Sequence, residues 1–268
     1  LTTVWIFSIL LVMAEDDRVQ QVHVLCQDVP RKLIEDFMQG MDPDYFSSFS
    51  WPMIAHHVTL AHQLTLARPC PTDNHTLPDQ RFQVTIVAYD YFSEFATFCG
   101  VLSSFGLDIR EALIFTTSQH SSPNTGHLPK AAVGGTRGVG ARHTPPGLTR
   151  NIAVDVFTLQ CLKGFQFGAL EQQRFSDDLV PLLLLLQHNH LRQARRQINR
   201  NLVETLGRLH VPETRMVQPV QITFSNSLAE NETVLDIRST DTPAFLYAFT
   251  NALAMRGVYL VKAKIEVD

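Results

Sequence analysis

The sequence predicts an α+β protein built from a repeated strand–helix–strand unit behind a short helical region. Two stretches, 84–114 and 235–265, align without a gap at a constant offset of 151 residues. The matched pairs are Asp90 with Asp241, Phe98 with Phe249, Leu102 with Leu253, Gly106 with Gly257, and Ile114 with Ile265. An ungapped register that keeps an aspartate before the helix and a glycine after it indicates more than a shared apolar pattern. We infer two copies of one unit.

Each part of the first copy has its own periodicity. Apolar residues alternate through Phe82, Val84, Ile86 and Ala88, which is the period of a half-buried strand. From Phe92 to Phe105 they recur at steps of three and four, which predicts one face of a helix. Gly106 ends that helix, because glycine accepts a left-handed backbone at little cost. A second strand is expected over 107–115.

The rest of the chain divides by composition. Region 28–67 reads as helices, with Ser50 and Pro52 at the start of one, and 68–80 reads as a loop. The first unit is predicted over 82–225, with a strand at 151–160, helices over 169–209 broken near Pro181, and a closing strand at 219–225. A flexible insertion rich in Gly, Pro, Ser and Thr fills 117–150. The second unit, 232–268, contains only half of the pattern and is read as truncated.

Composition restricts the class of protein. The net charge of -4 and the pI of 6.3 give no electrostatic reason to expect nucleic acid. Four scattered cysteines without a C-x-x-C pair indicate reduced thiols in the cytoplasm. The apolar stretch at 4–14 is too short to span a bilayer and lacks a preceding basic segment, so no membrane association is expected. Its role within segment 1–27 stays open between a buried or artefactual segment and a secretory signal.

The strand, the aspartate at a helix start and the glycine at its end resemble the ACT domain, a small amino-acid-sensing module of ferredoxin-like βαββαβ fold. The second copy keeps the D-x-P turn of that family through Asp241 and Pro243. Upstream, "DPDYFSSFSWPMIAHH" is similar to the helix before the ACT pair in bacterial nitrogen-control nucleotidyltransferases, most closely the glutamine synthetase adenylyltransferase group.

The resemblance implies a regulatory region that senses an amino acid such as glutamine. Its partners would be a catalytic nucleotidyltransferase domain or glutamine synthetase, and Mg²⁺ and ATP are expected only in that separate catalytic domain. No cofactor and no catalytic residue are predicted in this chain, because the Gly-Ser turn with paired aspartates is absent. A PII uridylyltransferase region, or a docking module without a small-molecule ligand, are the alternatives.

The resemblance places candidate ligand contacts at the two turns before the helices. The first turn is Asp90, Tyr91, Phe92 and Ser93, and the second is Asp241, Thr242, Pro243 and Ala244. Free N–H groups at a helix start could take a ligand carboxylate. Neither turn has the glycine that the family carries, and both aspartates could act as helix caps alone. In a docking module, outward residues of the sheet such as Val87 would contact the partner.

Three histidines of one predicted helix, His56, His57 and His62, are candidate metal ligands. His56 and His57 are adjacent, so they point about 100° apart on a helix and cannot both face one ion. Packing or an interdomain hydrogen bond is the preferred interpretation for these residues and for His62. No metal site is predicted.

Overall fold

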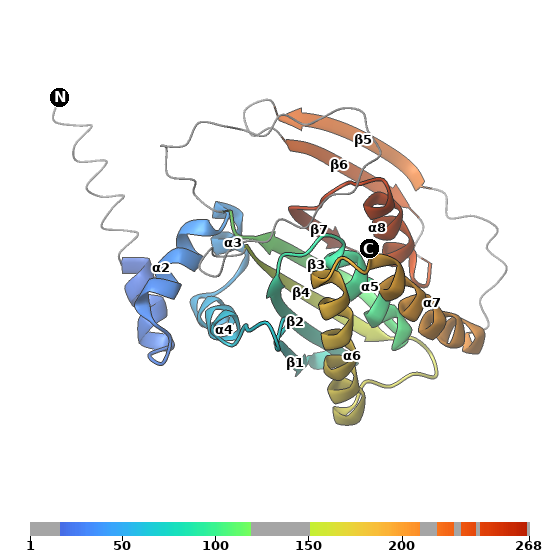
Figure 1. Cartoon of the computed structure of the whole chain (residues 1–268), viewed down its shortest axis with the longest axis horizontal. Coiled ribbons are helices and arrows are strands. Elements are labelled where there is room, and N and C mark those ends of the chain that lie inside the picture. Colours follow the sequence, from blue (N-terminus) through green and yellow to red (C-terminus); the bar gives the residue numbers. More distant parts are fainter. Residues whose placement is uncertain (1–16, 119–150, 210–218, 228–231, 240–241, 267–268) are drawn as a thin grey trace.

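A computed structural model describes residues 17–118, 151–209, 219–227, 232–239 and 242–266 (Figure 1). One antiparallel sheet of five strands, in the order β1-β2-β4-β3-β7, lies between two layers of helices. Strands β5 and β6 form a separate two-stranded sheet. The predicted α+β class is confirmed. The predicted insertion at 117–150 lies almost wholly outside the described residues, as do the apolar stretch at 4–14 and Asp241.

The helical region covers one face of the sheet. It comprises a helical segment at 17–25, α2 (Arg31–Gly40), α3 (Pro43–Ser48) and α4 (Trp51–His62). Ile34, Tyr45 and Ile54 of these helices pack with sheet residues that include Val87 and Val154. Val87 is fully buried there, so the hypothesis that it offers a docking surface is wrong. The chain's own helices already occupy that face.

The first unit, which begins with the first copy, contributes the central strands and helices of the opposite layer. Its elements are β2 (Arg81–Tyr89), α5 (Glu94–Ser104), β3 (Leu107–Thr116), β4 (Ile152–Cys161), α6 (Ala169–Gln187) and α7 (Leu191–Arg208). The expected break at Pro181 is wrong, since α6 continues through this residue. The helix buries Phe175, Leu179 and Leu183 on either side of the proline, and this packing offsets the lost hydrogen bond.

The edge of the sheet beside β2 differs from the prediction. Residues read as a loop form β1 (Thr72–Thr76) and a short 3-10 turn, η1 (Pro78–Gln80). β1 pairs with β2 from Thr72 opposite Ile86 to Thr76 opposite Phe82. Because β4 already pairs with the other edge of β2, neither edge of β2 remains free for a closing strand. β5 (Pro219–Ser227) pairs instead with β6 (Glu232–Ser239), so the prediction that it closes the first unit is wrong.

The second copy joins the first by edge-to-edge pairing. After β6 come α8 (Phe245–Met255) and β7 (Lys262–Glu266), which is shorter than β3. β7 pairs antiparallel with β3, and Leu113 lies opposite Lys264, its own counterpart at the offset of 151. Ala112 faces Ile265 and Ile114 faces Ala263, so the pairing has local two-fold symmetry. The counterpart helices α5 and α8 also pack together.

The glycines that end α5 and α8 allow a controlled test of how closely Phe165 packs against the end of α5. Gly106 and Gly257 both have left-handed backbones, with φ of 71° and 77°. A Cβ on Gly106 would lie 2.2 Å from the Phe165 ring, whereas one on Gly257 would meet nothing within 4 Å. We expect Gly257→Ala to lower the free energy of unfolding by about 1 kcal/mol, the cost of the left-handed conformation. Gly106→Ala should cost at least about 1 kcal/mol more.

Urea denaturation of the two variants measures this difference. Equal losses at Gly106 and Gly257 would contradict close packing of Phe165 against the end of α5.

Candidate ligand pocket between the two copies

The first predicted turn lines a small pocket where the two copies meet. Asp90, Tyr91, Ser93 and Glu94 contribute one wall. The other wall comes from the end of α8 and the segment after it, with the residues Thr250, Ala254, Val258, Tyr259 and Leu260. The pocket volume is about 30 Å³, which is space for about two water molecules. Phe92 lies at its rim, where its ring stacks on Tyr259.

The described residues of the second predicted turn do not line this pocket. Thr242, Pro243 and Ala244 are half-buried, and none of them is among its lining residues. Ala244 packs against the hydrophobic core instead. The structure therefore brings the first turn together with α8 and the segment after it, and residues 242–244 lie apart from the pocket.

Both turns keep a left-handed residue without a glycine. Ser93 has φ of 72° and Ala244 has φ of 62°, and these positions correspond at the offset of 151. This conformation costs a residue with a Cβ about 1–2 kcal/mol, so the surrounding packing imposes it. The N–H of Tyr91 donates to Oε2 of Glu94 over 2.9 Å. A backbone donor at the helix start is thus already engaged within the protein.

Three carboxyl groups, those of Asp90, Glu94 and Asp155, lie close together at this turn. Asp155 of β4 lies opposite Ile86 and Ile114 and is fully buried, and neither of its oxygens has a hydrogen-bond partner within the described structure. Burial, followed by the charge of Asp90, raises the pKa of Asp155 well above the usual value. Burial also raises the pKa of Glu94, and the charges of Asp90 and Asp155 add to the shift.

Asp90 is the most accessible member of this acidic group. Burial raises its pKa, and hydrogen bonds with Tyr259 and Asn151 oppose that shift. The Tyr259 hydroxyl donates to Oδ2 of Asp90, and this hydrogen bond joins the two walls of the pocket. Carboxyl groups in an apolar site hold protons or attract a cation, and they repel an anion. The pocket therefore suits an ammonium group better than a ligand carboxylate.

Sequence reasoning missed Asp155 and Glu94. Asp155 shares its strand face with Phe157 and Leu159, which pack in the same core. A charged residue at an inward position of an alternating strand is the signal that could have identified it. Glu94 and Tyr259 carry no comparable signal, since their proximity depends on how the two copies pack.

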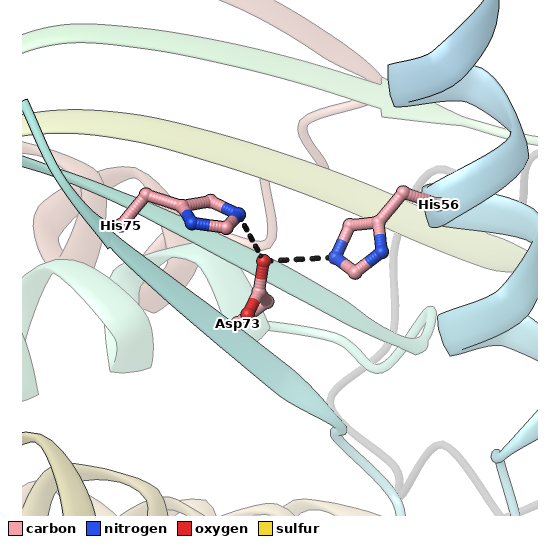
Figure 2. Close-up of side chains that lie close together, drawn as sticks. All are labelled: His56, Asp73 and His75. Carbon is pink, nitrogen blue, oxygen red and sulfur yellow. Dashed lines mark hydrogen bonds and ion pairs between the residues drawn. The ribbon is translucent and has the colours of Figure 1, made fainter.

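A second polar cluster lies on the opposite face of the sheet, between α4 and β1. Oδ2 of Asp73 is 2.8 Å from Nε2 of His56 and 2.6 Å from Nε2 of His75 (Figure 2). His57 is separate, because its Nδ1 shares a 2.8 Å hydrogen bond with the Tyr45 hydroxyl inside the core. Burial, with a smaller effect of His56, lowers the pKa of His57 to about 3. His62 is exposed.

Fold and pocket define an α+β protein with a duplicated unit and a small acidic site at the junction of the copies. The chain is 26% identical over 188 residues to the bifunctional uridylyltransferase/uridylyl-removing enzyme of Azospirillum brasilense. The match covers 69% of this chain and only 16% of that enzyme. No family model matches the chain, and no solved structure matches it. Among the described helices, none has the length and apolar character needed to span a membrane.

Proposed function

We propose that this chain is an amino-acid-sensing regulatory region of a nitrogen-control nucleotidyltransferase, with glutamine as the effector. The observation that carries the proposal is the pocket at the junction, because both copies of the repeat line it. A ligand that contacts both walls favours whichever arrangement of the copies fits it, and such differential binding is what a sensor requires. Similarity to a bifunctional uridylyltransferase supports the nitrogen-control setting.

The parent enzyme is proposed at the level of its reaction class. The resemblance of the sequence favours the glutamine synthetase adenylyltransferase group, whereas the relative reported above modifies by uridylylation. A region of a PII uridylyltransferase fits at least as well. Mg²⁺ and the nucleotide belong, in either case, to a separate catalytic domain. The cytoplasmic location stays a prediction.

The acidic pocket suggests how the effector would bind. Its α-ammonium group would pair with Asp90, in place of the Tyr259 hydroxyl that now donates to this carboxylate. A free amino acid is larger than the 30 Å³ pocket, so Tyr259 has to move away. Tyr259 is 44% exposed, so it can swing into solvent without leaving a cavity in the core. The extra negative charge of glutamate would face Asp90 and Glu94, and this favours glutamine.

Isothermal titration of the chain with glutamine and glutamate tests the proposal. We expect binding of glutamine with a Kd of about 1 mM, or about -4 kcal/mol, and weaker binding of glutamate. Asp90→Asn should reduce glutamine binding by about tenfold, because a charge-assisted contact is lost. Asp177→Asn serves as the control, because Asp177 is an exposed acid of α6 whose side chain accepts a hydrogen bond from the neighbouring Gln173. No heat with any amino acid at about 10 mM would overturn the sensor proposal.

The alternative function, a docking module without a small-molecule ligand, has its own support. Ile222 and Phe224 of β5 lie opposite Ile237 and Leu235 of β6, and together they form one apolar face. Phe224 is 72% exposed on this face. Exposed apolar patches of this kind often mark protein contacts. Association with a catalytic domain or glutamine synthetase, without any response to amino acids, is the outcome that would favour docking.

A further inference from the structure

We propose that His56, Asp73 and His75 bind one divalent first-row transition metal ion, of which zinc is the representative. Their ligand atoms all lie within 4.8 Å of one another. The set of two imidazole nitrogens and one carboxylate oxygen is typical of protein zinc sites with three protein ligands. The site is independent of the pocket between the two copies.

The fold brings these ligands together from two separate elements. Asp73 and His75 are two residues apart on β1, so both side chains leave the same face of that strand. They lie opposite Thr85 and Gln83 of β2, on the face that α4 covers. His56 extends from α4 toward them (Figure 2). The three ligands thus converge through tertiary packing, and none depends on a flexible terminus.

The distances are close to those of a metal site. Ligands about 2.0–2.2 Å from a tetrahedral ion are about 3.3 Å from one another. Here Oδ2 of Asp73 lies 2.8 Å from the Nε2 of His56 and 2.6 Å from that of His75, as in an ion pair. A shift that lengthens these two separations by about 0.5 and 0.7 Å would admit an ion. The exposed fractions of the His56 and His75 side chains, 42% and 60%, leave room for that shift.

The surroundings leave an open coordination position. A surface hollow of about 200 Å³ lies beside the cluster, lined by Met53, His56, His75, Gln83 and Thr85 among others. A water molecule can occupy the fourth position from this side. Imidazole nitrogens favour zinc, copper or nickel, whereas magnesium and calcium favour oxygen ligands alone, so the two histidines set the class of ion.

A bound ion would fasten the helical region to the edge of the sheet. Among the described strands, β1 pairs with β2 alone, so it has fewer backbone hydrogen bonds to hold it than β2 or β4. The ion would link this edge strand to α4. Its removal should therefore loosen β1 and α4 while leaving the pairing of β3 with β7 unchanged.

Metal titration of the untagged chain, after treatment with a chelator, tests the proposal. We expect one Zn²⁺ per chain, and an absorption spectrum typical of low coordination number when Co²⁺ replaces zinc. His75→Gln and Asp73→Asn should each weaken Zn²⁺ binding by at least about tenfold. Zinc should raise the melting temperature of the unmodified chain and leave that of His75→Gln unchanged.

His62→Gln is the matched control, since His62 is an exposed histidine on the same helix as His56. It should bind zinc like the unmodified chain. Equal zinc binding by His62→Gln and His75→Gln, or no binding by the unmodified chain, would overturn the proposal and leave an ion pair without a metal. Because the side chain of His75 is largely exposed, we expect His75→Gln to fold. Circular dichroism without metal verifies this for each variant.

Discussion

Asp155→Asn is expected to leave the free energy of unfolding nearly unchanged at pH 4 and to raise it increasingly at higher pH, by at least about 2 kcal/mol at pH 8. Asp155 is fully buried without a hydrogen-bond partner, so the folded protein favours its protonated form. An asparagine has nearly the same shape and never ionises. At high pH the folded protein must either ionise the buried carboxyl of Asp155 or keep it protonated, and both cost free energy. The asparagine variant removes this cost.

The direction of the pH dependence follows from the raised pKa. Burial raises the pKa of Asp155 above its value in the unfolded chain. Stability from this group is complete below the unfolded pKa near 4 and is lost as the pH rises toward the folded pKa. Each proton bound by the folded state alone changes stability by about 1.4 kcal/mol per pH unit. Glu94, whose pKa burial also raises, contributes in the same direction.

Urea denaturation at pH 4, 5, 6, 7 and 8 measures this effect. Glu204→Gln provides the control, because Glu204 is an exposed acid on α7 and its loss should not alter the pH profile. Parallel profiles for Asp155→Asn and the unmodified chain would contradict the assignment of a raised pKa. A variant that is more stable and also binds glutamine more weakly would indicate that the buried acid is kept for binding.

The second large effect is expected at Gly100, where α5 approaches both α7 and α8. A Cβ at this position would lie 2.5 Å from Ile198 and 2.8 Å from the Tyr247 ring. Tyr247 is buried and donates a 2.6 Å hydrogen bond to Asn199, so it cannot easily turn away. We expect Gly100→Ala to lower the free energy of unfolding by about 1–3 kcal/mol, despite the higher helix propensity of alanine.

Gly207→Ala is the matched control for this substitution. Gly207 is an exposed residue of α7, and a Cβ there would meet nothing within 4 Å. It should gain up to about 1 kcal/mol from helix propensity alone. Denaturation in urea separates the two variants, and a similar gain at Gly100 would show that the contact between the two copies is loosely packed.

The repeat was predictable from sequence because each copy carries its own local signals. Alternation in β2, the helical face of α5 and the glycine at its end each follow from short-range physics. β1 was not predictable in this way, because its polar sequence, TDNHT, has no apolar alternation. Pairing with the edge of β2 is what makes it a strand. The same edge pairing left β5 to pair elsewhere.

The candidate sites were predictable only in part. The turn at Asp90 was predicted from the resemblance to the ACT domain, and its residues line a pocket. Glu94 directly follows this turn, whereas Asp155 comes from β4 and Tyr259 from the second copy, so the full group meets only in the folded protein. The cluster of His56, Asp73 and His75 was missed because β1 had been read as a loop, which hid the two-residue spacing of Asp73 and His75 on one strand face.

The pairing of β3 with β7 makes the junction of the two copies independent of protein concentration. The two copies belong to one chain, so their encounter is intramolecular and has a high effective concentration. Separate copies would need a second molecule to build the same junction, and it would fall apart at low protein concentration. Here the strand pairing and the pocket beside it persist however dilute the protein becomes. Occupancy of the pocket would then follow the ligand concentration alone.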